Sequence, residues 1–236
     1  MDVLVSVAVI AILVGMLLPK LSQVQETARR VVCQSNVRQI GIGIMSYANE
    51  HQGWLPASVF LPDGPGRGSM EPQNMNTLRL AEGRWDGIGN LYLGEYVNAP
   101  KVFYCPSHRG EKPFLKYAGH FTAQPGEIIG NYHFRGEGPA GHGPHGPTTR
   151  NLDRIDPAFS SLISDSMQLQ SDYNHKVGSN FFRADLSVHW YSDPGSRIRF
   201  LLPATKAEAD NNLGYVPEVW SWFDDSANAE QQGTNP

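Results

Sequence analysis

The sequence predicts an α+β protein in which one long N-terminal helix precedes a loop-rich head with short strands. Three observations lead to this prediction: an apolar run at 3–18, helical spacing of apolar residues at 20–51, and short strand-like runs after residue 100. The chain has 236 residues, of which 24 are Gly and 17 are Pro. This share is above average, so much of the head must be turn and loop.

The charge of the chain argues against one class of function. Nineteen basic residues stand against 23 acidic ones, which leaves a formal net charge of -4. A nucleic-acid-binding protein would be expected to carry a basic patch or a high isoelectric point. We therefore expect no nucleic-acid partner.

The apolar run at 3–18 reads VLVSVAVIAILVGMLL. As a helix it would be roughly 24 Å long, against roughly 30 Å of membrane hydrocarbon. A secretory signal peptide would have a basic start, where this chain has Asp2. A buried helix of a soluble protein is the other alternative, but an N-terminus rarely holds the most apolar segment. We favour a membrane-inserted helix.

The stretch at 20–51 continues this helix with an apolar stripe. Pro19 should kink the helix, because a proline removes one hydrogen bond and clashes with the preceding turn. Two glycines weaken the second half, and the sequence GWLP at 53–56 should end it. The stripe residues, at steps of three and four, are Leu21, Val24, Ala28, Val31, Cys33, Val37, Ile40, Ile44 and Tyr47.

This division gives two expected parts. Residues 1–51 form the N-terminal helix, with an apolar part at 1–19 and an amphipathic part at 20–51. Residues 52–236 form a single loop-rich head domain, and no internal repeat is visible in it. The strand candidates in the head are 101–105, 128–134, 160–164, 180–183, 188–191 and 198–202.

The N-terminal pattern resembles a known family. The pattern begins with an acidic residue and the apolar run, which ends in GMLLP. It continues with ARR, CQSNVRQIG and a tyrosine-to-proline segment at 47–56. This order is similar to type IV pilin-like and type II secretion pseudopilin-like proteins. It is closest to the planctomycete family with a prepilin-type cleavage and methylation segment. The match covers some fifty residues, and FYCP at 103–106 matches a further family feature.

The resemblance implies a fold and a role. The fold would be a long kinked N-terminal helix packed on an antiparallel sheet. The role would be that of a structural subunit, not an enzyme, held in the inner membrane with a periplasmic or surface head until it joins a filament of other pilin-like subunits. Asp2 stands at the position of the acidic residue that in pilins pairs with a neighbour's terminal amine. Alternatively, Asp2 only caps the helix N-terminus.

The same resemblance raises a question about the start of the chain. Family precursors carry a short basic leader that a prepilin peptidase removes, and this sequence begins one residue before Asp2. We expect that the start was placed at an internal Met. Lys20, Arg29 and Arg30 follow the apolar run, and by the positive-inside rule they would keep the head in the cytoplasm. A basic leader before the run would favour the opposite orientation.

A second family signature, His followed after nine residues by Asp-Gly, lies near the other end. His175 and Asp185 have this spacing, but Leu186 replaces the Gly. We read the region as a hairpin whose turn at 184–187 differs from an Asp-Gly turn. His175 and Asp185, with Asp165, would converge beside it. Hydrogen bonding that fixes the turn is favoured over a metal site.

Cys33 and Cys105 are the only cysteines. In an oxidising compartment they would form a disulfide between helix and head. The alternative is that each is a small buried apolar side chain. A Cys-x-x-Cys metal or redox motif is absent from the sequence.

No catalytic motif stands out, so we expect no enzyme activity and no cofactor. His142 and His145 lie in a Gly/Pro-rich loop and are more readily explained as solvated than as metal ligands. Asp224 and Asp225 only weakly resemble a pseudopilin calcium loop. The main rival function is a surface glycan-binding module built on the tryptophans of the head, although core packing is the commoner role of large aromatics.

Overall fold

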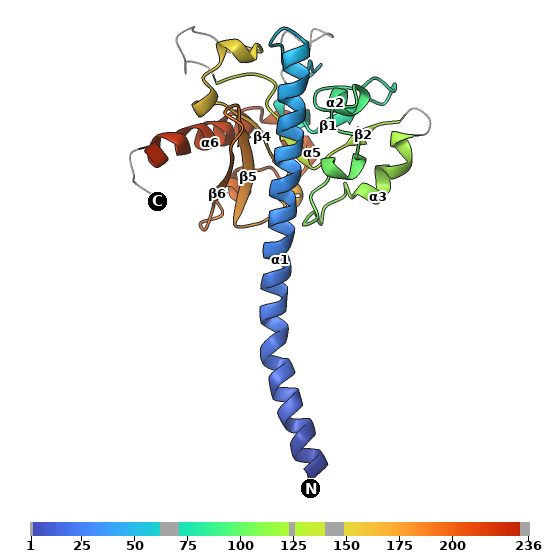
Figure 1. The fold of residues 1–236 in the computed structure, drawn as a ribbon, viewed down its shortest axis with the longest axis vertical. Coiled ribbons are helices and arrows are strands. Elements are labelled where there is room, and N and C mark those ends of the chain that lie inside the picture. Colours follow the sequence, from blue (N-terminus) through green and yellow to red (C-terminus); the bar gives the residue numbers. More distant parts are fainter. Residues whose placement is uncertain (1, 62–70, 123–125, 140–148, 232–236) are drawn as a thin grey trace.

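The computed structural model shows a long helix that rises out of a compact head (Figure 1). It describes residues 2–61, 71–122, 126–139 and 149–231. Within these ranges, the side chains of residues 2, 17–19 and 227–231 are not described. The α+β fold class is confirmed.

Helix α1 (Asp2–Glu50) is one continuous helix of 49 residues, about 74 Å long. Pro19 does not divide it. The kink expected at this position is reduced to a gentle bend in the N-terminal third of α1 (Figure 1). One missing backbone hydrogen bond is a small loss for a helix of this length. The C-terminal end is fixed by Gly53, whose φ of +81° lets its amide donate 2.8 Å back to the carbonyl of Ala48.

The head is built on a four-stranded antiparallel sheet in the order β3-β4-β5-β6. The strands are β3 (Tyr132–Phe134), β4 (Ser161–Asp165), β5 (Gly178–Arg183) and β6 (Val188–Ser192). The candidates at 160–164, 180–183 and 188–191 are therefore confirmed. The candidate at 128–134 splits in two: β2 (Ile128–Ile129) pairs with β1 (Thr77–Arg79) in a separate two-stranded sheet.

Two strand candidates are wrong. Residues 101–105 overlap a 3-10 turn, η2 (Pro100–Phe103), where Pro100 begins the turn. Residues 198–202 overlap α4 (Arg197–Leu201). The amides of Arg197 and Ile198, at the start of this helix, donate to the carboxylate of Asp193 at 2.7 and 3.0 Å. The alternation of apolar and basic residues in this segment is typical of a strand. The two buried residues, Ile198 and Leu202, are however four positions apart, which is the spacing of one helix face.

Further helices surround the sheets. The sequence did not predict α5 (Lys206–Asn211) or α6 (Tyr215–Gln231). Short helical segments complete the described chain: α2 (Gly89–Leu93), α3 (Phe114–Tyr117), η1 (Pro72–Asn74), η3 (Ala118–Phe121), η4 (Leu152–Arg154), η5 (Pro157–Phe159) and η6 (Gln170–Asp172).

Strand β5 lies between two apolar layers. Phe182 belongs to the main core cluster, which includes the C-terminal half of α1. Its neighbour Phe181 belongs to a second cluster and stacks on Phe223 of α6, with ring centroids 4.9 Å apart. Because successive side chains of a strand point to opposite faces, α1 and α6 cover the two sides of the sheet. This explains why every residue of β5 is buried.

Only part of the expected stripe on α1 is buried. Its core residues are Cys33, Val37, Ile40 and Ile44, all 0% exposed. By contrast, Leu21, Val24 and Val31 are more than half exposed, so the N-terminal part of the stripe does not pack on the head. Full burial on α1 begins at Cys33, while Arg30 and Glu26 further down the helix contact the head through Trp190 and through His175 and Ser107. How the chain divides into domains stays a prediction.

At Gly41 a side chain of β5 packs directly against the backbone of α1. A Cβ atom built on Gly41 would lie 2.4 Å from the ring of Phe182. Glycine is a poor helix former, so the sequence alone marks it as a weak point. In the structure it is what allows the ring to pack against the helix backbone.

The turn between β5 and β6 places a left-handed residue at Leu186. The Leu186 amide donates to the Arg183 carbonyl at 3.1 Å, and the Arg183 amide donates to the Ser187 carbonyl at 3.0 Å. Leu186 has a φ of +70°, the left-handed conformation that suits glycine. The expectation that leucine would produce a different turn is therefore wrong. The chain makes a three-residue loop with a left-handed residue, and leucine bears the strain.

Replacing Gly41 with Ala should lower the free energy of unfolding by about 1–3 kcal/mol, because the methyl group collides with Phe182. Gly15→Ala is the matched control, since a Cβ there meets nothing within 4 Å. Both can be measured by chemical denaturation of the full chain in detergent. A Gly41→Ala variant as stable as the parent would contradict the packing.

Replacing Leu186 with Gly should raise the free energy of unfolding by about 0.5–1 kcal/mol, because relief of the left-handed strain exceeds the entropy cost of glycine. Leu186→Ala keeps the strain and should give no gain. Thermal unfolding of the two variants measures the difference. Equal stability of the Gly and Ala variants would show that the turn is not strained.

Candidate functional site

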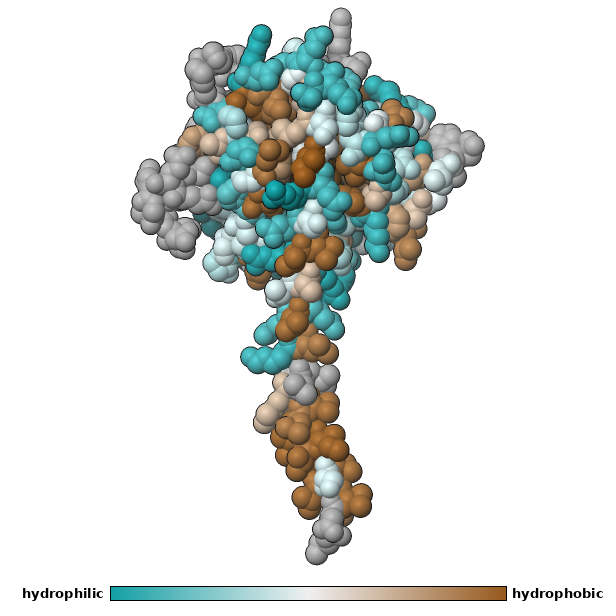
Figure 2. Space-filling model, in the orientation of Figure 1, coloured by the Kyte–Doolittle hydropathy of each residue, from teal (hydrophilic) through white to brown (hydrophobic). Residues whose placement is uncertain are grey.

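The N-terminal part of α1 is an apolar rod outside the head. Figure 2 shows this part of the helix as almost uniformly hydrophobic, in contrast to the mixed surface of the head. Its large apolar side chains are between 45% and 77% exposed. They occupy successive positions, so they lie on every face of the helix. They are Val3, Leu4, Val5, Val7, Val9, Ile10, Ile12, Leu13, Val14 and Met16.

Asp2 is the first residue of α1. Its side chain lies outside the described side chains, so both its pairing with a neighbouring subunit and its role as a helix cap stay predictions. By length and composition α1 is a candidate membrane span, and its most apolar window is 0% buried.

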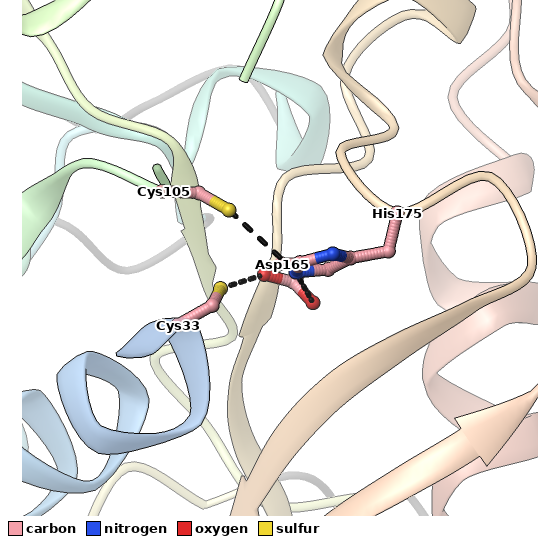
Figure 3. A group of neighbouring side chains, drawn as sticks. All are labelled: Cys33, Cys105, Asp165 and His175. Atoms are coloured by element: carbon pink, nitrogen blue, oxygen red, sulfur yellow. Dashed lines mark hydrogen bonds and ion pairs between the residues drawn. The ribbon is translucent and has the colours of Figure 1, made fainter. Parts of the chain in front are cut away.

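A buried polar cluster lies where α1 enters the head. Cys33, Cys105, Asp165 and His175 each offer a ligand-type atom, and these atoms all lie within 4.8 Å of one another. The four residues are between 0% and 5% exposed. Figure 3 shows that they converge from α1, the loop after η2, the end of β4 and the loop before β5. We call these four residues the neck cluster.

Local structure aims each side chain. Cys33 is the N-terminal member of the buried stripe on α1, and Asp165 is the last residue of β4. Pro106 disfavours a helical conformation at Cys105, which follows η2. His175 begins a tight turn in which its carbonyl accepts from the Val177 amide at 2.6 Å, across a residue with a φ of +59°.

The distances within the neck cluster are short. The Cys33 thiol donates to Asp165 Oδ1 at 2.8 Å. Cys105 Sγ lies 3.6 Å from His175 Nε2, and the same nitrogen lies 3.7 Å from Asp165 Oδ2. Two thiols, one imidazole nitrogen and one carboxylate thus face a common point.

A second set of groups holds these side chains in place. His175 Nδ1 lies 2.9 Å from Glu26 Oε1, which also accepts from the hydroxyl of Ser107 at 2.8 Å. The amide of Asn180 donates to Asp165 Oδ2 at 2.6 Å. The hydroxyl of Tyr132 lies 3.2 Å from Cys33 Sγ. The orientation of each member is therefore fixed from outside the cluster.

Burial and close contacts shift the pKa values of three members of the neck cluster. Burial alone would lower the pKa of His175, but the charge of Asp165 and contacts with Cys105 and Glu26 raise it to about 10. Burial also tends to raise the pKa of Cys105, yet hydrogen bonds with Cys33 and His175 bring it below the usual value. Burial and the charge of Asp165 raise the pKa of Cys33.

A cation and an aromatic ring close the cluster on one side. The guanidinium of Arg30 lies 3.2 Å from the centroid of the Trp190 ring. The same ring meets His175 edge to face, with centroids 5.7 Å apart. Arg30, one turn before Cys33 on α1, thus extends the contact between the helix and β6.

The sequence matches the model of a family described as a protein of unknown function (DUF1559), over residues 22–155. This segment covers more than half of the chain. The chain belongs to the DUF1559 family. No curated protein and no solved structure matches the sequence.

The DUF1559 match covers the part of the chain that contains Glu26, Cys33 and Cys105. Asp165 and His175 come from the segment that follows it. The neck cluster of this DUF1559 protein is therefore assembled from both the matched segment and the rest of the head.

The structure separates the two signature residues. His175 is buried in the neck cluster and faces Asp165. Asp185 is exposed in the β5–β6 turn, where its carboxylate accepts from the Ser187 amide at 2.9 Å. Convergence of His175 with Asp165 is observed, whereas no contact joins His175 to Asp185 among the described residues.

Other candidates have different roles or lie outside the described residues. Cys33 and Cys105 are free buried thiols in the structure, so a disulfide between them stays a prediction. Asp224 pairs with Arg135 at 2.5 Å and accepts from the Ser161 amide at 2.9 Å, which ties α6 to the sheet and leaves no reason for a calcium site. Asp225 is exposed. His142 and His145 lie outside the described residues.

Sequence reasoning missed the supporting groups. Glu26, Tyr132 and Asn180 carry no motif, and each acts through a partner far away in the chain. The sequence predicts a contact between Cys33 and Cys105 and another between His175 and Asp165. Nothing in the spacing of these residues indicates that the two pairs form one cluster. Only the packing of α1 on the sheet brings them together.

Arg30→Ala should lower the free energy of unfolding by about 1 kcal/mol, because the cation–π contact with Trp190 is lost. Arg29→Ala is the matched control, since Arg29 makes only a partly exposed ion pair with Glu26 at 3.7 Å. Chemical denaturation compares the two. A larger loss for Arg29→Ala would contradict this assignment.

Proposed function

We propose that this chain is a pilin-like structural subunit, anchored in the membrane by the N-terminal part of α1 before it assembles into a filament. The filament would be of the type IV pilus or type II secretion pseudopilus kind. In this proposal the head lies on the periplasmic or outer side, and the chain acts by assembly, without an enzyme activity of its own.

The observation that carries the proposal is the contrast along α1. The stripe from Cys33 to Ala48 is core, while the large apolar residues from Val3 to Met16 are exposed on every face. A single protein partner covers one face of a helix. Lipid, or a bundle of several helices, covers all of them. A rod of this kind is suited first to a bilayer and then to the centre of a filament.

Family membership and sequence pattern support the same role. The chain belongs to the DUF1559 family, and its first fifty residues resemble a prepilin-type segment. The partners would be other pilin-like subunits and, on a precursor with a leader, a prepilin peptidase. An acidic side chain at the end of the rod is costly in hydrocarbon unless it is paired. Asp2 would therefore help to select the register of assembly.

The tryptophans do not favour the glycan-binding alternative. Trp220 is buried and packs edge to face on Phe223, while Trp190 lies under the Arg30 guanidinium. Trp85 packs beside Tyr92. Only Trp54, 51% exposed, offers a largely open ring. One open ring is a weak basis for a sugar-binding platform.

Replacing Ile10 with Asp should prevent membrane insertion, because a carboxylate near the centre of the span costs about 2.5–3.5 kcal/mol. Ile42→Asp is the matched control: Ile42 is also exposed on α1 but lies beside the head. Alkaline carbonate extraction of membranes separates inserted from soluble protein. Insertion of the Ile10→Asp variant at the parent level would refute the anchor.

Asp2→Asn should leave membrane insertion intact and reduce incorporation into filaments, because the paired charge is removed while the rod is unchanged. The measurement is the amount of the chain in sheared filament fractions relative to the membrane fraction. Asp225→Asn, at an exposed site of the head, is the control. Normal incorporation of Asp2→Asn, or absence of the parent chain from filaments, would count against the assembly role.

A further inference from the structure

We propose that the neck cluster, Cys33, Cys105, Asp165 and His175, is a structural zinc site that joins α1 to the head. The proposal is independent of filament assembly, because it rests on the interior of one chain. It is argued below from the donor atoms, their spacing, their supporting hydrogen bonds and their burial.

The donor set matches the preferences of zinc. Structural zinc sites take four ligands from thiolate, imidazole and carboxylate groups. Calcium and magnesium require shells of oxygen ligands, and this cluster offers only one carboxylate. Two sulfur donors, one nitrogen and one oxygen are typical of a borderline-soft ion.

The spacing is close to that of a tetrahedral site. Zinc bond lengths of about 2.3 Å to sulfur and about 2.0 Å to nitrogen or oxygen place the ligand atoms about 3.3–3.8 Å apart. The Cys105 Sγ to His175 Nε2 and His175 Nε2 to Asp165 Oδ2 distances are 3.6 and 3.7 Å. Cys33 Sγ and Asp165 Oδ1, now hydrogen-bonded at 2.8 Å, would separate by less than about 1 Å when the ion replaces the thiol proton.

The supporting contacts are those that metal ligands require. A zinc-bound histidine usually donates its second nitrogen to a carboxylate, which fixes the ring. His175 directs Nε2 into the cluster and Nδ1 toward Glu26 Oε1 at 2.9 Å. Asp165 is fixed in the same way by the Asn180 amide at 2.6 Å.

The four donor groups are enclosed together. Asp165 is 1% exposed and faces the His175 ring at 3.7 Å, so an ion bound between them would meet the carboxylate in place of the ring's proton. A disulfide between Cys33 and Cys105 is the competing arrangement, because the two sulfurs lie within 4.8 Å. It would remove the hydrogen bond from Cys33 to Asp165 and leave the carboxylate and imidazole aimed at an apolar S–S bond. Zinc uses all four groups.

An ion has a route to the site. A cavity of about 420 Å³ is lined by Asn36, Tyr104, Cys105 and Asn131, among others. It therefore reaches one ligand from the outside. On binding, the thiols and the His175 ring release their protons to solvent, because zinc binds thiolate and neutral imidazole.

The first test uses the reduced full chain in detergent, stripped with a chelator and then titrated with Zn²⁺. We expect one zinc per chain by elemental analysis and a higher unfolding temperature. Co²⁺ in place of Zn²⁺ should give the intense absorption of tetrahedral cobalt with thiolate ligands. Ca²⁺ should produce neither effect.

Variants assign the binding to these residues. Cys33→Ser and His175→Ala should abolish stoichiometric binding, whereas His120→Ala, at an exposed histidine, should not. If the first two fail to fold, Glu26→Gln remains informative, because the Glu26 side chain is 43% exposed and outside the core. It should weaken zinc binding about 10- to 100-fold. Glu50→Gln, also exposed on α1, should leave affinity unchanged.

Three results would overturn the proposal. The first is a folded, reduced chain that binds no zinc. The second is zinc binding that survives in Cys33→Ser, His175→Ala and Glu26→Gln at the parent affinity. The third is native protein, isolated without reductant, whose mass and thiol count show a Cys33–Cys105 disulfide.

Discussion

The contact between α1 and β5 at Gly41 and Phe182 is the constraint on which the rest of the structure depends. A ring that would collide with any Cβ at that position sets how close the helix lies to the sheet. At this separation Cys33, Val37 and Ile40 are fully buried. The same contact makes the C-terminal half of α1 part of the head, so the apolar rod below it extends from a fixed base.

The neck cluster lies at the boundary between these two halves. Cys33 is the N-terminal fully buried residue of α1, and Glu26, two turns earlier, still reaches the cluster through His175. Below this point the helix has no head to pack on. In the proposed filament, a subunit that packs through its helix would need a firm connection between helix and head here. Arg30 on Trp190 and the neck cluster both connect α1 to the head at this level.

The sequence predicted the architecture better than the details. The apolar run, the α+β class and the strands β4, β5 and β6 follow from local pattern. Residues 198–202 were misread because Phe200, an exposed residue, alternates with arginines as in a strand. Helix α6 was overlooked although its buried positions repeat at helical spacing. Its role in covering Phe181 depends on the sheet, which no local pattern displays.

The site was harder to predict for a physical reason. Each member of the neck cluster has a sequence context that explains it separately: a buried cysteine, a Cys-Pro turn, the end of a strand, a histidine of a signature. Their convergence needs the tertiary packing of α1 against β4 and the loop before β5. The turn at Leu186 is set locally instead. Its backbone hydrogen bonds impose a left-handed conformation on a leucine, which disfavours it.

The most direct test of the central claim, that α1 is both head core and free rod, is hydrogen–deuterium exchange along α1 in the full chain in lipid nanodiscs. Amides from Val37 to Ala48 should exchange as slowly as those of β5, because both open only when the head unfolds. Amides from Leu21 to Val31 should exchange faster. If Val37 to Ala48 exchanged as fast as Leu21 to Val31, α1 would not be part of the head core, and the account would be wrong.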